Sequence, residues 1–369
     1  MNLAILIGRF PPGVVGGAEL QAEAWARRLA GRHRIRVITR RLPEDQPALE
    51  HREGFEVIRL TVSRVPLWRT VRDLVAIERA VDGLVPRPDL LLCFQTFVSG
   101  LAGVRIQRRH RIPAVVWVRG EEELRTGACD RSRWITPRVW NAAAGVLVQS
   151  ERTRAALITG LERVAPALAP RVAAKLEVVP NGIDLPPTST APGRGVLAVG
   201  RLIRDKGMDT VIEAAAAAGL ELTIAGDGPE RTSLEALAAA QGGSVRFEGM
   251  ASRERLAELY RCAGCVALAS RRGEGLPNVL LEAMAYSRPV VATPVMGVAD
   301  LVRHEINGLL IPPGDVGALA GALARLAGDP TLTARLSAGA RETAKQFAWE
   351  RVEPRLETVL ARWGTPAHA

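Results

Sequence analysis

The sequence predicts an α/β protein with two doubly wound domains that face each other across a cleft. Short, fully apolar runs alternate with stretches of helical periodicity along the chain, as is typical of parallel sheets covered by helices on both faces. A Pro-, Ser- and Thr-rich segment at 184–193 interrupts this alternation near the middle and has the composition of a linker. The 369 residues, of which 47% are hydrophobic, suffice for two cores.

Seven apolar runs in the first half are expected to be strands, and the periodicity between them predicts helices such as 18–30 and 68–84. The expected strands are Leu3–Gly8, Arg34–Thr39, Phe55–Leu60, Asp89–Phe94, Ala114–Val118, Gly145–Gln149 and Leu176–Val179. Strands that alternate with helices in this way form βαβ units and a parallel sheet. Residues 1–185 are therefore assigned to an N-terminal domain.

The second half repeats the pattern. Its expected strands are Gly195–Val199, Glu221–Ala225, Ser244–Glu248, Gly264–Leu268 and Pro289–Ala292, with helices at Met208–Ala217, Pro229–Ala240 and Arg253–Cys262. We assign residues 186–346 to a C-terminal domain and residues 347–369 to a last helical segment, built on the periodic run 349–363.

The composition predicts a cytoplasmic globular protein. The apolar opening, 1–8, has no basic region, is too short for a signal-peptide core and leads into a Gly/Pro loop. No uncharged apolar run approaches the roughly 18 residues of a membrane-spanning helix. Four scattered cysteines exclude a disulfide scaffold. Cys262 and Cys265 lack a second Cys pair or a nearby His for zinc, so both are expected to be buried thiols.

The formal charge of +10 is confined to the first half of the chain. Residues 1–185 contain 29 basic and 19 acidic side chains, whereas residues 186–369 contain 20 of each. A positive surface on one half suits an anionic membrane or a phosphorylated acceptor. Aromatic residues make up 4% of the chain and no stacking or groove-reading motif is present, so nucleic acid is not an expected partner.

The first candidate site residues follow the first strand. Ligands of doubly wound folds bind outside the carboxyl ends of the strands. Gly16 and Gly17 permit close backbone approach, and the helix that they open offers free N–H groups, which together make a phosphate cradle. The loop matches neither G-x-G-x-x-G nor a P-loop, so neither signature is present. A plain strand-to-helix turn is the alternative interpretation.

Two cations follow the first strand of the second domain. Arg201 and Lys206 lie five residues apart around a turn that begins at Gly200, so both can point into the cleft. Arg201 offers a planar fork and Lys206 a point charge, and together they could hold a diphosphate. The alternative is that both are solvated loop charges.

A Gly-rich loop after the strand at 264–268 carries Glu274. Pro277 suits the first turn of the helix that follows, so the N–H groups around Gly275 and Leu276 would face an anion beside the two cations. Glu274 would then lie where a sugar attached to that anion must be. In the alternative interpretation Glu274 is only a charge at a helix terminus.

Glu282 lies eight positions after Glu274, inside the same helix. It could accept hydrogen bonds from another polyol, such as a ribose. The alternative is a solvated helix residue, but Glu282 stands between Leu281 and Ala283, where a carboxylate without a partner would be costly.

Two further strand ends give weaker signals. Asp227 and Glu230, in a Gly-rich turn before a helix, serve equally well as helix-start residues. Gly249 ends a strand where its backbone could reach a nucleotide base.

Taken in order and spacing, these segments resemble the retaining nucleotide-sugar glycosyltransferases of family 4 (group 1), which have the GT-B fold of two Rossmann-like domains. The matching stretches are Gly-Gly-Ala-Glu19, Val-Pro-Asn-Gly-Ile-Asp184, Val-Gly-Arg-Leu with Lys-Gly207, Ala-Gly-Asp-Gly-Pro229, Glu-Gly-Leu-Pro-Asn with Glu282 completing an E-x7-E pair, and Arg-Pro-Val-Val-Ala-Thr293. The resemblance covers nearly the whole chain.

The resemblance implies roles for particular residues. Arg201 and Lys206 would neutralise the leaving diphosphate, Glu274 would contact the donor sugar near its reacting carbon, and Glu282 would bind the nucleotide ribose. Gly16 and Gly17 would approach the phosphates or the acceptor. The reaction would move a sugar from a UDP- or GDP-sugar to a hydroxyl of a saccharide or lipid-linked acceptor, in polysaccharide or glycolipid biosynthesis.

The resemblance also implies a mechanism without a protein nucleophile, in which the departing phosphate oxygen accepts the proton of the acceptor hydroxyl. The chain has no Asp-x-Asp metal signature and no convincing Ser/His/Asp or Cys/His arrangement. We therefore expect no metal site and no cofactor beyond the nucleotide-sugar. The segment 347–369 is expected to cross back onto the first domain, as in relatives.

The acceptor is expected to bind the N-terminal domain. Two stretches, Arg59–Arg72 and Arg131–Ala142, interleave Arg with Trp and aliphatic residues, as an interfacial segment would. With the charge division, this predicts peripheral attachment to the inner face of the plasma membrane. Ordinary amphipathic helices that pack on the sheet are the alternative.

Two positions differ from the family pattern. Arg119 stands in the region where many relatives have a His near the donor sugar, so Arg119 is taken as a candidate donor-binding residue, although the family's His contact itself is not carried over. Ser287 replaces the usual Gly before the Pro-Val-Val run, which is expected to alter a helix end.

Other functions remain open at this stage. A nucleotide-sugar epimerase of the same fold would need acid and base residues on both sides of the sugar, and none are found. A non-catalytic sugar-nucleotide-binding protein would be expected to lose Glu274 or Lys206, and both are present. A dinucleotide-dependent dehydrogenase would require G-x-G-x-x-G.

Overall fold

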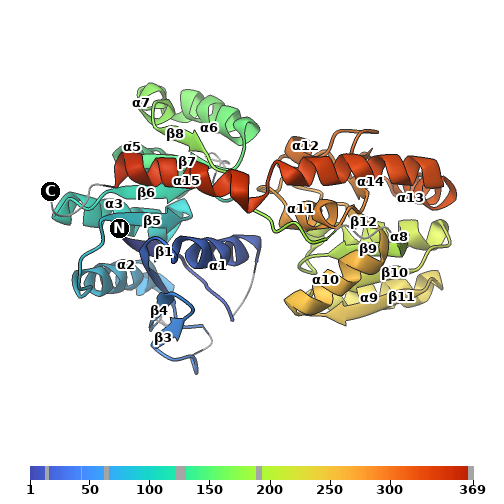
Figure 1. Ribbon diagram of the computed structural model, residues 1–369, viewed down its shortest axis with the longest axis horizontal. Helices are drawn as coiled ribbons and strands as arrows, with labels where there is room; N and C mark the ends of the chain where they lie inside the picture. Colours follow the sequence, from blue (N-terminus) through green and yellow to red (C-terminus); the bar gives the residue numbers. More distant parts are fainter. Residues whose placement is uncertain are drawn as a thin grey trace. The chain divides into compact units, whose positions relative to one another are not determined.

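The computed structural model describes residues 1–12, 16–42, 44–61, 66–120, 123, 130–187 and 193–364, with backbone only at 66–69 and 130–133. The chain divides into two units: Met1–Pro180 together with Glu353–Ala369, and Asn181–Val352. Each unit consists of one largely or wholly parallel sheet and the helices that connect its strands (Figure 1). The expected class of two doubly wound α/β domains is confirmed.

Unit 1 is built on an eight-stranded sheet of order β3-β4-β2-β1-β5-β6-β7-β8. Its strands are β1 Asn2–Leu6, β2 Arg34–Arg40, β3 Leu49–Arg52, β4 Phe55–Leu60, β5 Leu90–Phe94, β6 Ala114–Trp117, β7 Gly145–Val148 and β8 Leu176–Val178. Its helices are α1 Gly17–Leu29, α2 Pro66–Asp82, α3 Leu101–His110, α5 Asp130–Ala142, α6 Glu151–Val164 and α7 Ala169–Ala173, with a π-turn at Thr96–Gly100.

One strand of unit 1 departs from the expected parallel sheet. β3 pairs with β4 in antiparallel register, whereas the other described pairs are parallel. β3 was not predicted, because it lies at the sheet edge, reads Leu-Glu-His-Arg and alternates exposed with half-buried positions, so it has no apolar run.

Unit 2 has a six-stranded, wholly parallel sheet of order β11-β10-β9-β12-β13-β14. The strands are β9 Arg194–Val199, β10 Leu222–Ala225, β11 Val245–Gly249, β12 Ala263–Leu268, β13 Val290–Ala292 and β14 Gly308–Leu310. The helices are α8 Met208–Ala217, α9 Arg231–Gln241, α10 Arg253–Cys262, α11 Asn278–Ala285, α12 Val298–Leu301, α13 Val316–Gly328 and α14 Pro330–Lys345, with a 3₁₀ turn, η2, at Arg204–Lys206. α15, Trp349–Trp363, begins in unit 2 and continues into unit 1 from Glu353.

Alternate residues of the central unit 2 strands enter two different cores. Val196 and Ala198 of β9 join one cluster with α8, α9 and α13, while Leu197 and Val199 join the other with α10, α11 and α14. Both faces of the sheet are therefore covered, which explains why its strands read as continuous apolar runs rather than as alternating ones.

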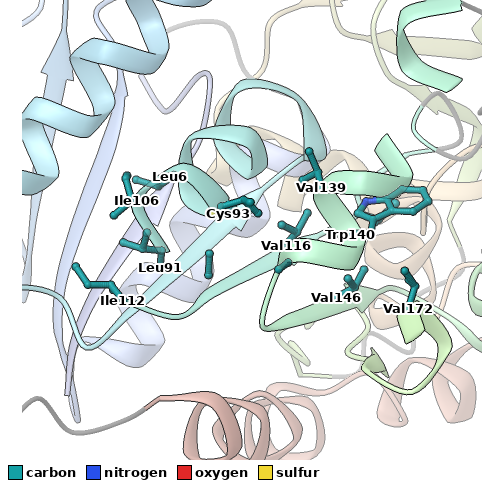
Figure 2. Packing of buried hydrophobic residues seen from close by; sticks show 14 of the residues in the cluster. Leu6, Leu91, Cys93, Ile106, Ile112, Val116, Val139, Trp140, Val146 and Val172 are labelled. Carbon is teal, nitrogen blue, oxygen red and sulfur yellow. The ribbon is translucent and has the colours of Figure 1, made fainter. Parts of the chain in front are cut away.

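Unit 1 packs in the same way. Leu91 and Cys93 of β5 lie in one core with Ile106 of α3, and Val116 of β6 lies near Trp140 of α5 (Figure 2). On the opposite face the chain buries another set, in which the ring centroids of Trp25 on α1 and Trp117 on β6 are 5.7 Å apart and Trp363 of α15 packs on Gly145 of β7.

The division between the units falls at Pro180, whereas the sequence placed it after residue 185. The Asn181 side chain donates to the Leu276 carbonyl at 2.9 Å, and Ile183 forms a bridge with Ala348. These contacts hold the Asn181–Asp184 turn in unit 2. Residues 188–192 of the expected linker lie outside the described part of the chain.

Three expectations about individual side chains are wrong. Cys262 is exposed at the end of α10, and only Cys265 is buried in β12, where burial raises the pKa of its thiol to about 12. Trp140 and Arg59 are not interfacial, because Trp140 is core and donates to Thr96 Oγ1 at 2.8 Å, and buried Arg59 pairs with Glu50 at 2.6 Å.

The end of α11 explains the departure at Ser287. Ser287 has φ = 58°, its N–H donates to Met284 O at 3.0 Å, and the N–H of Arg288 donates to Ala283 O at 2.9 Å. This pair of bonds is a Schellman motif, whose left-handed position favours glycine. The backbone of Ser287 therefore has a strained left-handed conformation, which a glycine would adopt without a Cβ clash.

We expect Ser287→Gly to stabilise unit 2 by about 1 kcal/mol, because it removes the strain of a left-handed L-residue. The check is the denaturant midpoint of wild type and variant. Ser287→Ala is the matched control: it keeps the strained backbone but removes the buried hydroxyl, whose oxygen has no partner in the described structure. An equal gain for the alanine variant would assign the effect to the hydroxyl instead.

Candidate functional site

The strand order of unit 2 fixes where its functional loops meet. The chain runs outward from β9 through β10 to β11, then returns to place β12 on the other side of β9. The loops after β9 and β12 therefore leave the same edge of the sheet in opposite directions, at a topological switch point. Lys206 comes from the first loop and Glu274 from the second.

Lys206 and Glu274 form an ion pair at this switch point. The Lys206 ammonium donates to both carboxylate oxygens of Glu274, at 2.6 and 2.8 Å. The side chains are 21% and 16% exposed, so the pair is largely withdrawn from water but remains reachable from outside. The sequence predicted both residues in the site but assigned them to separate contacts, with phosphate and with sugar.

Ser270 is a second partner of Glu274 that the sequence did not single out. Its hydroxyl donates to Glu274 Oε1 at 2.5 Å, and its carbonyl accepts from Thr293 Oγ1 at 2.6 Å. Ser270 and Thr293 are both fully buried. A small hydroxyl directly after a buried strand was the available signal, but its partner four residues later depends on how the loop turns.

The backbone of the Glu274 loop is held by the turn that follows β13. The N–H of Glu274 donates to the carbonyl of Met296 at 2.8 Å. Gly297 has φ = 85°, and a Cβ there would lie 1.7 Å from the carbonyl oxygen of Gly275. Only glycine permits this approach, so the position of the carboxylate depends on a contact from the next βα unit.

Three glycines mark adjacent strand ends on the other side of the switch point. The N–H of Gly200 donates to Ala225 O at 3.0 Å, and the N–H of Gly226 donates to Gly249 O at 2.7 Å. A Cβ on Gly226 would lie 1.9 Å from the carbonyl oxygen of Gly200. The loops after β9, β10 and β11 therefore stack closely, which places predicted residues Gly200 and Gly249 along one edge.

Arg201 is exposed, unlike Lys206. Its carbonyl accepts from the N–H of Ile203 at 2.9 Å, but within the described part of the chain its guanidinium has no hydrogen-bond or ion-pair partner. Both side chains come from one loop and Lys206 is paired with Glu274, so joint action of Arg201 and Lys206 on one ligand stays a prediction. Arg201 and Arg204 are both exposed cations of this loop, and Arg201 is the nearer of the two to the end of β9.

The start of α11 is organised by Asn181. Its amide donates to Leu276 O at 2.9 Å and to Asn278 Oδ1 at 2.6 Å, and Asn181 is itself buried. Leu276 is buried, and Pro277 is the residue before the first helical position. The helix N-terminus thus lies directly after Glu274 and Gly275, as the sequence predicted, with Asn181 as an additional support.

Glu282 lies about one turn into α11 and does not contact Glu274. Its Oε2 accepts a hydrogen bond from the hydroxyl of Tyr260, on α10, at 2.7 Å. Burial raises the pKa of the Glu282 carboxyl, and the Tyr260 hydrogen bond and the charge of Arg253 partly offset that rise. The sequence indicated that a carboxylate at this apolar position would need a partner. That partner is Tyr260, which lies 22 residues earlier in the chain.

The predicted residues of unit 1 lie at the corresponding edge of the other sheet. Gly16 directly precedes α1, and its N–H donates to Glu19 Oε2 at 3.1 Å, while Gly17 is the first helical residue. Residues 13–15 of the same loop, like Glu121 and Glu122 after β6, lie outside the described part of the chain.

Arg119 is more deeply packed than a ligand-contacting arginine was expected to be. It is 7% exposed, and its guanidinium lies over the rings of Phe94 and Trp117 at 5.3 and 5.0 Å. Burial lowers the pKa of Arg119 to about 10, and the charges of Glu123 and Glu19 oppose the shift. Glu123 in turn accepts from the N–H of Thr96 at 2.6 Å and of Arg119 at 2.9 Å.

The unit 2 arrangement suits an anionic ligand that also carries hydroxyls. An exposed Arg, a paired Lys and a helix N-terminus can bind phosphate oxygens. The carboxylates of Glu274 and Glu282 can accept hydrogen bonds from hydroxyl groups. Among the described residues, no group of three or more His, Cys, Asp or Glu side chains has the arrangement of a metal site.

We expect Glu282→Gln to make the protein more stable at neutral pH. Because burial raises the folded-state pKa of Glu282, the unfolded state releases this proton first, so stability falls as pH rises from about 4, the unfolded carboxyl pKa, through the folded value. The neutral amide avoids that loss and can still accept from Tyr260. Thermal midpoints measured from pH 4 to 8 should show a gain that disappears at the acid end.

The exposed carboxylate Glu258 on α10 provides the control. Glu258→Gln should not show this pH-dependent gain. If the two variants depended on pH in the same way, the half-buried Glu282 carboxylate would not be the cause.

The chain matches two family models. The model described as "Glycosyl transferase 4-like domain" matches residues 16–182, and the model described as "Glycosyl transferases group 1" matches residues 193–329. The two matches fall almost entirely in units 1 and 2, respectively.

Curated relatives match over part of their length. The chain is 32% identical to the exopolysaccharide phosphotransferase SCO2592 of Streptomyces coelicolor over 94% of its own length and 39% of the relative's. It is 36% identical to the lipopolysaccharide core biosynthesis glycosyltransferase LpsE of Rhizobium meliloti, over 45% of this chain and 49% of that protein. The chain spans about half or less of the length of such relatives.

Solved structures match the whole chain. The sucrose-phosphate synthase of Thermosynechococcus elongatus has a TM-score of 0.84 at 23% identity over 98% of both chains. Anabaena Alr3699/HepE in complex with UDP has a TM-score of 0.78 at 22% identity, over 98% of this chain and all of that one. These likenesses concern the fold. With the two family models, they show that the chain belongs to the group 1 glycosyltransferases and has the two-domain GT-B fold.

Proposed function

We propose that the protein is a retaining glycosyltransferase that moves a sugar from a UDP- or GDP-sugar to a hydroxyl of a saccharide or lipid-linked acceptor. The observation that carries this proposal is the Lys206–Glu274 ion pair at the switch point of unit 2. It sets a cation for phosphate and a carboxylate for sugar hydroxyls side by side. A nucleotide-sugar is a ligand that presents both phosphate and hydroxyl groups.

The cations would stabilise the diphosphate as it departs. The Lys206 ammonium has three donors, so it can bind a phosphate oxygen while keeping its contact with Glu274. Because the Lys206–Glu274 pair is neutral as a whole, the exposed Arg201 supplies the surplus positive charge. Preorganised donors of this kind stabilise charge that develops in the transition state.

Glu274 would orient the donor sugar, and no residue need act as a nucleophile. Ser270 and Lys206 hold the carboxylate by three hydrogen bonds, which fixes its direction. In the front-face route, the phosphate oxygen released from the sugar accepts the proton of the acceptor hydroxyl. The new bond forms on the face that the phosphate leaves, so the anomeric configuration is retained.

We propose that this chemistry needs no metal ion. In this proposal Arg201, Lys206 and the start of α11 perform the charge neutralisation for which other transferases use a divalent cation bound to Asp-x-Asp. The chain contains no Asp-x-Asp sequence.

The acceptor is proposed to be a polysaccharide or glycolipid intermediate of the cell envelope. The printed functions of two relatives, exopolysaccharide and lipopolysaccharide core biosynthesis, support this class. SCO2592 is named as a phosphotransferase, but the chain covers 39% of it, so we do not transfer that reaction to this protein.

We also propose peripheral attachment of unit 1 to the inner face of the plasma membrane. The positive excess of the chain lies in residues 1–185. On α5, Trp134 is 59% exposed and Arg138 stacks over its ring at 5.5 Å, a pair suited to the interfacial zone of a bilayer. Among the described helices, none combines the length and the apolar character that crossing a bilayer requires.

Thermal-shift titration with UDP, GDP, ADP and NAD, each with and without EDTA, tests the donor site. We expect UDP or GDP to stabilise the wild type in the presence of EDTA and to lose this effect in Lys206→Ala. Lys345→Ala is the matched control, because Lys345 forms an exposed ion pair with Glu342 in the same unit. Stabilisation by NAD alone, or by none of the four, would contradict the proposal.

With the donor so identified, turnover of the Lys206→Ala variant should fall by about 100- to 1000-fold, the effect of losing one preorganised contact to developing charge. NMR of the product should show the anomeric configuration of the donor. Near-normal turnover in this variant would contradict the role of Lys206, and an inverted product would contradict the proposed route.

Flotation with vesicles tests the membrane proposal. We expect binding to vesicles that contain anionic phospholipid at 0.15 M salt and release at 1 M, since the Debye length shortens from about 8 to about 3 Å. Trp134→Ala should weaken binding, whereas Ile306→Ala, which shortens an exposed apolar side chain of unit 2, should not. Failure to bind at low as well as high salt would remove the proposal.

A further inference from the structure

The two tyrosines of the chain lie together at Glu282. Tyr260, on α10, is 1% exposed, and its ring stacks on that of Tyr286 with centroids 5.7 Å apart and planes 12° apart. Tyr286 follows α11 four residues after Glu282, so it lies on the same side of the helix. The hydroxyl of Tyr260 donates to Glu282 Oε2 at 2.7 Å.

This arrangement fixes the direction of a carboxylate. Within the described part of the chain, Tyr260 is the hydrogen-bond partner of the Glu282 carboxylate, and it occupies one of the two oxygens. The stack on Tyr286 restricts rotation of the Tyr260 ring, so its hydroxyl is held in place from two sides. Glu282 Oε1 is left to accept from a group outside this cluster.

The carboxylate is costly where it stands. Glu282 is flanked by the fully buried residues Leu281 and Ala283, and Tyr260 belongs to the same apolar core as both. One neutral hydroxyl compensates only part of the cost of withdrawing a carboxylate from water. A purely structural hydrogen bond could be made here by a neutral glutamine at lower cost, which favours a role for the negative charge in binding.

On the basis of the proposed donor site, we infer that Tyr260 is a positioning residue that aims Glu282 at the ribose hydroxyls of the donor nucleotide and so determines selectivity for ribo- over dideoxyribonucleotides. Tyr260 itself does not contact the ligand in this scheme. It acts by holding the carboxylate in the one orientation from which Oε1 faces a hydroxyl pair.

If Tyr260 positions Glu282 for the ribose, then removal of the Tyr260 hydroxyl should weaken binding only of nucleotides that have ribose hydroxyls. Calorimetry on the full chain measures the affinities of UDP and GDP and of their 2′,3′-dideoxy forms. In the wild type the ribonucleotide should bind more tightly than its dideoxy form. In Tyr260→Phe the affinity for the ribonucleotide should fall about tenfold, the typical effect of a hydrogen bond to a charged group, with little change for the dideoxy form.

Tyr286→Phe is the matched control, because it removes a hydroxyl from the stacked ring without removing the hydrogen bond to Glu282. It should leave the ribose preference unchanged. Tyr260→Phe keeps the buried ring, and its thermal midpoint reports whether unit 2 remains folded. In a Glu282→Ala background, Tyr260→Phe should have no further effect on nucleotide affinity.

The outcomes separate this inference from the proposed function. If the wild type binds neither UDP nor GDP, the donor site itself is wrong and the inference falls with it. If UDP or GDP binds but Tyr260→Phe weakens ribo- and dideoxy forms equally, or weakens neither, the donor site stands and the positioning role is overturned.

Discussion

The ion pair between Lys206 and Glu274 is the interaction on which the organisation of unit 2 depends. It joins loops from two βα units that leave the sheet in opposite directions, and no local sequence preference would bring them together. The supports of Glu274 come from a third place: Thr293 holds Ser270, and Met296 and Gly297 hold the loop backbone. The site is therefore a product of the parallel sheet, whose strand ends all meet at one edge.

The two carboxylates of the candidate site, Glu274 and Glu282, differ in how their charge is compensated in the absence of a ligand. Glu274 is matched by a cation and a hydroxyl, so its charge is compensated before any ligand arrives. Glu282 has a neutral donor, and burial raises its pKa. The first carboxylate is stable and preorganised, whereas the second is held at some cost to the fold. When a ligand supplies further hydrogen-bond donors to such a destabilising carboxylate, the cost of its desolvation is offset, and this favours binding.

The sequence predicted the parts of this structure that depend on local pattern. The apolar runs predicted the parallel strands other than β14. Gly200 and Gly249 were predicted as candidate ligand contacts, and the structure shows that they lie where neighbouring loops approach each other. The edge strand β3 was missed because its charged residues give no apolar signal. Asn181 and Tyr260 were missed because their roles depend on contacts between distant segments, and Ser270 because its contact with Glu274 depends on how the loop turns. Arg59 and Trp140 were misassigned because an amphipathic pattern does not reveal which side faces the core.

The net positive charge of the chain lies in its first half, whereas the second half is neutral as a whole. Residues 186–369 carry equal numbers of basic and acidic side chains, so the attraction of unit 2 for an anion must come from the local placement of Arg201 and Lys206. Residues 1–185 carry the whole excess, much of it on the surface, while Arg59 and Arg119 are buried. A diffuse excess acts through the field over about a Debye length and favours extended anionic partners. In the proposed function, unit 2 therefore recognises its ligand by geometry, whereas unit 1 attracts an anionic partner by net charge.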